Sequence, residues 1–323
     1  MIACYGPVTR APRRRVSCDS EPMSLTIQNP RRQRTVRWSP TSPAKRALIV
    51  LLVLLAILLA RGLTEPYSLS VDRTVITSPD VPPGFDGARI VFLADVHTGR
   101  AAYRSRRSVA KLVARVNAEK PDVVILGGDY VGGQNGGDKL FYPEIAKLVA
   151  PSGVVAAMGN HDIREGRDVA VAGFASANIP LVVNGSVTLQ RRGGHIRVAV
   201  VDDPWAGSDI TSAAADGISP SEFAIFVAHT PDTFPTALPA TDGVFDLALA
   251  GHTHGGQVTL FGLYAPVIPS AYGQRYRGGW RTEQGIPVLV TRGIGTTGLP
   301  LRFFAQPQFH VIELRRGPAD AQH

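Results

Sequence analysis

From residue 88 onward, short apolar runs that end in polar residues alternate with segments of helical periodicity. The runs 88–97 (ARIVFLADVH), 122–130 (DVVILGGDY) and 153–162 (GVVAAMGNHD) predict strands. Between them, residues 105–119 place valine and leucine at helical spacing, and residues 139–150 predict a shorter helix. This alternation of strand and helix predicts a parallel sheet with right-handed crossovers.

The second half of the chain is richer in strands than in helices. Residues 210–222 predict only a turn or a short helix. We therefore expect an α/β fold, with two packed sheets flanked by helices in one domain of roughly 87–316. The further strands are predicted at 195–202, 223–229, 245–250, 286–292 and 309–315.

Ahead of this domain lies an apolar run, ALIVLLVLLAILLA, with no polar side chain over residues 47–60. A helical membrane span needs about 20 apolar residues, whereas a run of about 10–14 also suits the core of a signal peptide. Lys45, Arg46 and Arg61 can extend a short span by snorkelling. We expect a membrane anchor at 47–63, with a cleaved signal peptide and a buried helix as the alternatives.

Basic residues are concentrated in the segment before the apolar run. Residues 1–46 hold ten Lys and Arg against Asp19 and Glu21, which accounts for the whole net charge of +8. The rest of the chain is electrically balanced, which argues against nucleic-acid binding. By the positive-inside rule, we expect a single-pass protein of a bacterial-type membrane, with a cytoplasmic N-terminus and an extracytoplasmic catalytic domain.

The segments outside the expected domain contain few candidate catalytic or ligand residues. Residues 1–46 predict a disordered basic tail, 64–86 a proline-rich linker with one possible strand, and 317–323 a C-terminal tail. Cys4 and Cys18 both lie in the N-terminal tail. The domain therefore has neither disulfides nor thiolate ligands for a metal.

Polar residues collect where the predicted strands end, which is where open α/β sheets place their ligands. Each residue taken alone is more often a helix cap, a turn former or a core histidine. Alternation along extended chain would point Asp95 and His97 to one side, and likewise His252 and His254. His195, His310 and His323 are not grouped with other candidate ligands at strand ends and are interpreted as structural or surface residues. The strand-end set is Asp95, His97, Asp129, Asn160, His161, His229, His252 and His254.

The chemistry of this set indicates a metal site. Imidazole, carboxylate and amide ligands without thiols suit divalent ions such as Zn, Fe or Mn, and do not suit a calcium cage. Two carboxylates, an amide oxygen and four imidazoles make seven ligands, which are too many for one tetrahedral ion and suit two. Paired ions in hydrolases lie about 3.5–4 Å apart and promote in-line phosphoryl displacement.

The ordered series DVH, GGDY, GNHD, AHT and GHTHGG resembles the calcineurin-like metallophosphoesterases, over nearly all of 88–316. The resemblance implies a four-layer α/β/β/α sandwich with a dinuclear centre. It further implies that His161 contacts the phosphate and assists the leaving group; the alternative is a turn residue carried along by the motif. The implied ligands are Asp95, His97 and His254 for one ion, Asn160, His229 and His252 for the other, and Asp129 as the bridge.

Departures from the family pattern indicate which branch of the superfamily this chain resembles. Ser/Thr protein phosphatases of the superfamily continue as GDxxDRG, whereas this chain reads GDYVGGQ, which puts protein phosphatase activity in doubt. The stretches GHTHGGQ, GQRYRGG and TRGIGTTGLPLRF resemble membrane-associated bacterial phosphoesterases, a group that includes hydrolases of lipid A precursors. Arg292 and Arg302 could bind phosphate in bidentate fashion or be solvated loop residues.

We therefore expect a membrane-anchored phosphoesterase that uses two divalent ions, Mn, Fe or Zn. It would hydrolyse a phosphodiester or pyrophosphate bond by attack of a metal-bridging hydroxide. The substrate would be a phosphorylated small molecule or a lipid-linked phosphate at the membrane. The alternatives are a broad phosphomonoesterase with the same site and a catalytically inactive metal-binding membrane protein.

Overall fold

The computed structural model describes residues 42–132 and 136–318. The chain divides by its contacts into two units, Met1–Ile49 and Val50–His323, and helix α1 runs from the first into the second. Most of the predicted basic tail lies outside the described residues, together with Cys4, Cys18 and His323. The second unit holds both sheets and every predicted site residue.

The strands form two mixed sheets. The first has the order β1-β11-β2-β3-β4, and the second has the order β5-β6-β7-β8-β10-β9. Strands β2, β3 and β4 run parallel in the first sheet, as do β6, β7, β8 and β10 in the second. Antiparallel pairs occur at β11–β2, β5–β6 and β10–β9. The strands are β1 (Ser70–Ser78), β2 (Arg89–Leu93), β3 (Val123–Leu126), β4 (Gly153–Ala156), β5 (Gly185–Arg191), β6 (Gly194–Val200), β7 (Ala224–Val227), β8 (Leu247–Ala250), β10 (Ile286–Val290), β9 (Gly279–Glu283) and β11 (Gln308–Arg316).

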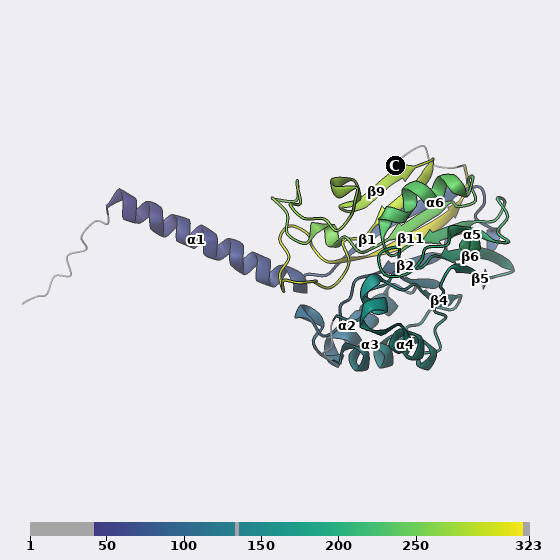
Figure 1. Cartoon of the computed structure of the whole chain (residues 1–323), viewed down its shortest axis with the longest axis horizontal. Helices are drawn as coiled ribbons and strands as arrows, with labels where there is room; N and C mark the ends of the chain where they lie inside the picture. The colour runs from purple at the N-terminus through teal and green to yellow at the C-terminus, as the bar shows by residue number, and fades with distance from the viewer. Residues whose placement is uncertain (1–41, 133–135, 319–323) are drawn as a thin grey trace, which may run out of the picture. The chain divides into compact units, whose positions relative to one another are not determined.

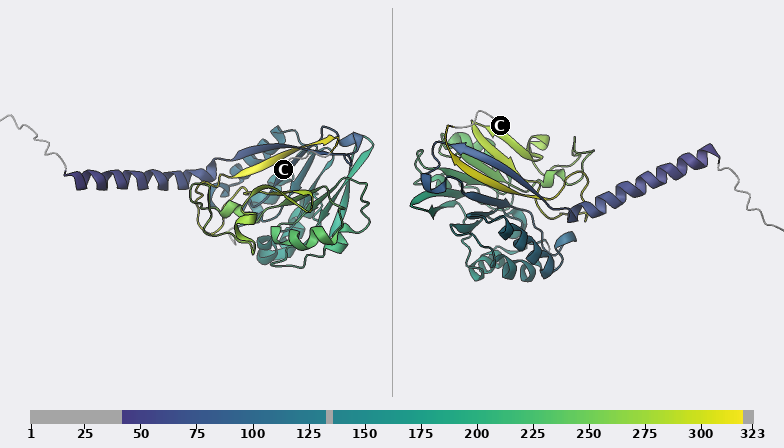
Figure 2. Two further views of the ribbon diagram at one scale, coloured as in Figure 1. Left: turned by 90° about the horizontal axis from the view of Figure 1, so that it is seen from above. Right: turned by 180° about the vertical axis from the view of Figure 1, so that it is seen from behind.

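The helices cover the outer faces of the two sheets. Figure 1 shows α2, α3 and α4 grouped on one side of the domain, with α5 and α6 over the other sheet. Both views in Figure 2 show β1 and β11, which lie at opposite ends of the sequence, side by side. The helices are α1 (Pro43–Thr64), α2 (Arg106–Ala118), α3 (Gly137–Ile145), α4 (Asn160–Ser176), α5 (Thr211–Ala215) and α6 (Phe234–Ala240), and the short 3-10 turn after α1 is η1 (Glu65–Tyr67).

Alternation of buried side chains along the strands explains these layers. In β2, Ile90 and Phe92 face the second sheet in a core shared with Val198 and Val227. Their neighbours in β2 face α2, α3 and α4 on the other side. In the second sheet, Phe226 and other outer residues pack on α5 and α6. Burial on both faces requires continuously apolar strands, as the sequence has them.

The predicted fold class is confirmed, with two mixed sheets flanked by helices and one apolar N-terminal helix. The sequence reading did not include the edge strands β5 and β9 or the helices α4 and α6. The strand expected within 64–86 is β1, which pairs in parallel with β11 and so forms part of the first sheet. This part of the chain is therefore packed on the domain.

Helix α1 is long and apolar enough to cross a membrane, with a mean hydropathy of 2.6 over its best window. Its leucine, isoleucine and valine side chains are exposed, for example Leu55 and Leu59. This exposure excludes the buried-helix alternative for the residues of α1. The helix ends at Thr64, where η1 leads the chain into β1.

Candidate metal centre

Left-handed turns bring the strand-end residues together. The polar residues follow β2, β3 and β8 within a few positions, at the carboxyl ends of these strands. Backbone hydrogen bonds hold neighbouring turns in place: Asp95 N–H donates to Gly128 O (2.9 Å) and His97 N–H to Asp129 O (3.1 Å). The φ angles in these turns are 58° at Asp95, 46° at His97, 57° at Asp129, 70° at His252 and 51° at His254.

These angles correct one expectation from the sequence. Asp95 and His97 do not lie on extended chain, and neither do His252 and His254, so simple alternation does not explain their convergence. A non-glycine residue in such a conformation costs roughly 1–3 kcal/mol and persists only where its surroundings fix it. Strain of this kind is typical of functional sites.

Close packing around two of the carboxylates leaves no room for larger neighbours. A Cβ at Gly159 would lie 2.2 Å from Asp129 Oδ1. Gly293 has a φ of 66°, and a Cβ there would lie 2.6 Å from the Cβ of Asp95. Glycine is therefore required at both positions for the carboxylates to sit where they do.

The predicted aspartate and histidine ligands fall into two groups of buried residues, and a third group overlaps both by joining His97 and Asp129 to the half-buried His161. In the first group, His254 Nε2 lies 3.0 Å from His97 Nε2 and 3.5 Å from Asp95 Oδ1. Two ring nitrogens that face each other at this distance repel unless a proton or a cation lies between them. Ligands at about 2.0–2.1 Å from one ion are spaced in this way.

The second group contains Asp129, His229 and His252. His229 Nδ1 lies 2.7 Å from Gly127 O, so this nitrogen carries the proton and donates it to the carbonyl. His229 Nε2 lies 3.2 Å from Asp129 Oδ2. Burial alone would lower the pKa of His229, but the adjacent Asp129 carboxylate raises that pKa well above its usual range, so an ion that binds Nε2 would displace a proton. A ring fixed by a backbone carbonyl in this way has the form that binds a metal.

Asp129 lies between the two groups. Its Oδ2 is 3.2 Å from His229 Nε2 and 3.6 Å from His97 Nε2, one atom from each group. Its Oδ1 accepts a hydrogen bond from His161 N–H at 2.8 Å. No other carboxylate in the described chain appears in two of the candidate metal groups.

Asn160 is the first residue of α4, between Gly159 and His161, both of which contact Asp129. Its side chain is buried, and Oδ1 has no hydrogen-bond partner among the described residues. His229 Nε2 likewise lacks a hydrogen bond in the described chain. Buried acceptors without donors are costly, and a cation would satisfy both atoms. The residues present therefore fit divalent metal ions.

Burial has opposite consequences for the candidate ligands. It raises the pKa of Asp95 to about 7, so an ion that binds this carboxylate competes with a proton near neutral pH. Burial lowers the pKa of both His97 and His252 to about 3, so both rings are neutral at pH 7. Burial alone would raise the pKa of Asp129, but neighbouring His229 holds that pKa well below its usual range. Neutral imidazoles and an ionised carboxylate are the forms that coordinate metals.

His161 lies at the edge of the centre. Its ring meets the His97 ring edge-on at 4.9 Å, and its Nδ1 lies 3.5 Å from Glu165 Oε1. The His161 side chain is 27% exposed, whereas the side chains of His97 and Asp129 are essentially fully buried. His161 can therefore meet a bound molecule from solvent.

The two predicted phosphate-binding arginines have different positions. Arg292 is partly exposed, packs on Gly255 and lines a small pocket with Arg277. Arg302 is fully buried, and its guanidinium donates to Gly295 O (2.6 Å) and Ala305 O (2.8 Å). The structure therefore does not place Arg302 where the predicted phosphate contact would need it.

Arg302 instead supports the turn that carries His254. Its Nη2 lies 3.2 Å from His254 Nδ1, and its Nη1 donates to His254 O at 3.4 Å. Sequence reasoning missed this role because a buried arginine is rare.

We expect Arg302→Met to lower the free energy of unfolding by about 3 kcal/mol, because the buried carbonyl oxygens of Gly295 and Ala305 lose their donors, at about 1–3 kcal/mol each. Urea unfolding of the full chain in detergent micelles measures the change. The matched control is Arg315→Met, since Arg315 is half exposed and pairs only with Glu313 among described residues. Equal destabilisation by the two variants would contradict the structural role of Arg302.

Two aspartates that the sequence analysis left without roles also surround the centre. Asp162, the last letter of GNHD, accepts hydrogen bonds from Asp129 N–H (2.7 Å) and Gly159 N–H (3.0 Å). Asp203 accepts from the backbone of Trp205 (2.9 Å), whose ring meets His252 edge-on at 4.6 Å. Both aspartates follow or adjoin predicted strand ends, and this position is the sequence feature that could have identified them as part of the site.

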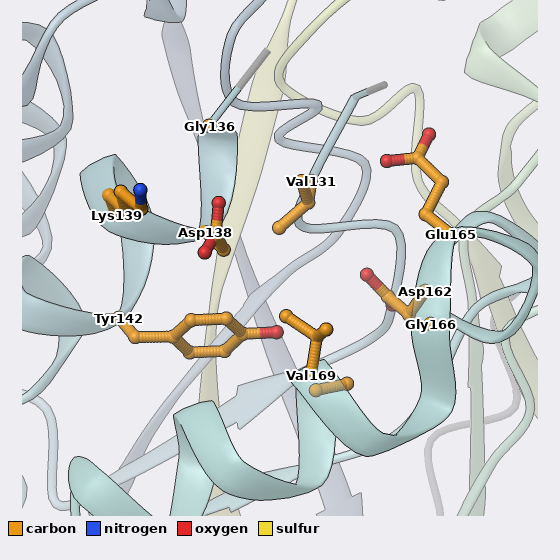
Figure 3. A pocket seen from close by; sticks show the side chains of 10 residues that line it. Val131, Gly136, Asp138, Lys139, Tyr142, Asp162, Glu165, Gly166 and Val169 are labelled. Atoms are coloured by element: carbon orange, nitrogen blue, oxygen red, sulfur yellow. The ribbon is translucent and has the colours of Figure 1, made fainter. Parts of the chain in front are cut away.

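A pocket of about 360 Å³ is lined in part by Asp162 and Glu165, which lie on α4 with His161. Figure 3 shows its lining, with Asp138 and Tyr142 on one side and Asp162 and Glu165 on the other. Glu165 connects the pocket to the metal centre through its contact with His161. The pocket is therefore a cavity next to the centre, on the side of the partly exposed histidine.

Comparison with known proteins gives the family. The family model for calcineurin-like phosphoesterases matches residues 88–256. YkuE of Bacillus subtilis (strain 168), named an uncharacterized metallophosphoesterase, is 33% identical over 256 residues, covering 78% of this chain and 87% of YkuE. Phosphodiesterase YaeI of Escherichia coli (strain K12) is 29% identical, covering 70% of this chain and 82% of YaeI.

A zebrafish (Danio rerio) protein named "transmembrane protein with metallophosphoesterase domain" is 27% identical over 304 residues, covering 88% of this chain and 66% of that protein. This likeness and helix α1 together indicate membrane association. The match of the family model runs through the turns that carry the buried aspartates and histidines. The chain therefore belongs to the calcineurin-like metallophosphoesterases, hydrolases that use divalent metal ions to cleave phosphoric esters.

Proposed function

We propose that this chain hydrolyses a phosphodiester or pyrophosphate bond at a centre that holds two divalent ions, Mn, Fe or Zn. The observation that carries the proposal is the position of Asp129 Oδ2, within 3.6 Å of a histidine from each ligand group. A carboxylate in this position can bridge two ions. Bound ions would act as Lewis acids and lower the pKa of a coordinated water to near neutrality.

The chain's own residues divide into two ligand sets in this proposal. Asp129 contributes to both sets, and its negative charge offsets the repulsion between two cations. The left-handed turns hold the ligands in place before any ion binds, so ordering the site on metal binding costs little free energy. One set is Asp95, His97 and His254, and the other is Asn160, His229 and His252.

His161 would act on the substrate rather than on the ions. Its side chain is partly exposed beside the centre, and its backbone is fixed by the hydrogen bond to Asp129. Glu165 Oε1 lies 3.5 Å from His161 Nδ1, close enough to orient the ring. A protonated His161 would bind the phosphoryl oxygens and supply a proton to the leaving oxygen.

Two observations support the nature of the substrate. The relative named a phosphodiesterase favours a diester over a monoester. Helix α1 favours a substrate at the membrane surface, such as a lipid-linked phosphate or a phosphorylated small molecule. Arg292, which is partly exposed near the His254 turn, would contact a distal phosphate.

The assay that tests this function measures the full chain on bis-p-nitrophenyl phosphate and on p-nitrophenyl phosphate. We expect EDTA to remove hydrolysis of both compounds, Mn²⁺ to restore it, and the diester to be the better substrate. Turnover that survives complete removal of metal would contradict the proposed centre. A preference for the monoester would replace the diesterase assignment with a broad phosphomonoesterase.

The proposal includes an orientation, with the basic N-terminus in the cytoplasm, residues 47–63 as the anchor and the domain of 87–316 outside. Protease added to intact cells should degrade the domain. Protection of the domain until the cells are broken would contradict this orientation.

A further inference from the structure

We propose that one face of the catalytic domain rests on the bilayer that holds α1. This face, the docking face, consists of residues 258–267 and 299–304 together with Tyr67. The proposal goes beyond phosphoester hydrolysis and does not depend on it, because it concerns where the domain sits.

Large apolar side chains are exposed on the docking face. Leu263 is 83% exposed and Val267 is 73% exposed, although side chains of this type usually pack in a core. Single exposed apolar residues need no explanation, but a contiguous set marks an interaction surface. The set on these segments is Tyr67, Leu260, Phe261, Leu263, Tyr264, Val267 and Leu299.

These segments are tied to the end of the apolar helix. Arg302 N–H donates to Gly62 O (3.0 Å), and the Arg61 guanidinium lies 4.1 Å from the centre of the Phe304 ring. The Glu65 carboxylate accepts backbone hydrogen bonds from residues 304 and 305. Phe261 joins the arrangement through its ring contact with Phe304 at 5.4 Å. The exposed residues thus lie next to the residues at which α1 ends.

The sheet topology places the metal centre at the same edge of the domain. β1 follows α1 and begins at Ser70, which pairs with Gln308, the first residue of β11. β11 runs antiparallel to β2, so its first residues lie beyond the carboxyl end of β2. Gln308 N–H donates to Gly293 O, and Gly293 packs on Asp95. A domain that rests on the docking face would therefore hold its catalytic edge near the lipid.

Positive charge adjoins the docking face. Arg107, Lys111 and Arg115 recur every four residues along α2, so they lie on one side of the helix. All three are exposed and line a hollow that also contains Pro66 and Tyr67, directly after α1. None of the three forms an ion pair within residues 42–132 and 136–318. Unpaired cations next to exposed aromatic residues fit anionic lipid headgroups.

The occupant of the docking face is a bilayer rather than a second copy of the chain. The face is continuous with the end of a helix whose own apolar side chains need lipid. Its mixture of leucine, phenylalanine and tyrosine beside basic residues is the composition of segments that lie in a membrane interface.

The experiment uses the full chain in vesicles of phosphatidylcholine and phosphatidylglycerol. Because the only cysteines are Cys4 and Cys18, replacing both with serine allows one new thiol to be labelled with the fluorophore NBD. Leu263→Cys places the label on the docking face. Because the Leu263 side chain is exposed, this substitution should leave the fold intact. Val149→Cys is the matched control, since Val149 is 61% exposed and precedes β4, at the opposite edge of the first sheet.

We expect the label at position 263 to emit at shorter wavelength and to be quenched by nitroxide-labelled lipids, and the label at position 149 to show neither effect. Equal behaviour at the two positions would overturn the proposal. A wavelength shift at 263 without quenching by lipid would also overturn it, in favour of a protein–protein contact. Replacing phosphatidylglycerol with phosphatidylcholine should reduce the quenching, and unchanged quenching would refute the contribution of the basic side of α2. No readout depends on enzymatic activity.

Discussion

Asp129→Ala is expected to abolish phosphoester hydrolysis and to deplete both ions from the centre. Asp129 Oδ2 lies 3.2 Å from His229 and 3.6 Å from His97, so its loss weakens both proposed ligand groups at once. Loss of a group that only orients a ligand lowers metal affinity or activity about 10–100-fold, and loss of the bridge should exceed this range. Turnover and the metal content of the purified variant measure the effect.

The matched control is Asp86→Ala, which removes an exposed carboxylate that accepts a hydrogen bond from Arg316 N–H, outside the predicted site. Circular dichroism of both variants shows whether the fold is kept. Wild-type turnover in a folded Asp129→Ala variant would remove the bridging role. Loss of only one ion with turnover retained would assign Asp129 to a single group.

His161→Ala should lower turnover while leaving the metal content unchanged, which separates it from Asp129→Ala. General acid catalysis by a positioned histidine is typically worth about 10²–10⁴-fold. The loss should grow as the leaving group becomes more basic, because a poor leaving group needs the proton most. Turnover of a series of aryl and alkyl phosphodiesters measures this dependence.

His195→Ala serves as the control because His195 also pairs with a glutamate, with 2.8 Å between His195 Nε2 and Glu222 Oε1, yet belongs to none of the candidate metal groups. This variant should retain wild-type turnover. An equal loss across all leaving groups in His161→Ala would contradict proton donation, and a loss of metal would make His161 a ligand instead.

Strands could be predicted from the sequence where burial makes them uniformly apolar. β2 and β3 hold apolar runs buried on both faces, and β4 reads GVVA with its last two residues buried, so their apolar sequence identifies all three. β5 and β9 lie at sheet edges and read GSVTLQR and GWRTE, in which polar residues hide the strand. α4 escaped notice because Gly166, with a φ of 140°, interrupts its helical periodicity.

For the candidate site, the residue types were easier to predict than their geometry. Asp95, Asp129 and His254 could be singled out because they follow strands. Their convergence depends on left-handed turns, which sequence periodicity does not reveal in residues other than glycine. The position of Arg302 behind His254 was also hidden, since an arginine after a glycine-rich stretch is normally assigned to the surface.

The most direct test of the two-ion centre is a Mn²⁺ titration of the metal-free full chain, followed by electron paramagnetic resonance. The account predicts that two ions bind per chain and that the saturated protein gives the spectrum of an exchange-coupled pair, because Asp129 lies between both ligand groups. Saturation at one ion per chain, or an uncoupled Mn²⁺ spectrum at full occupancy, would contradict it.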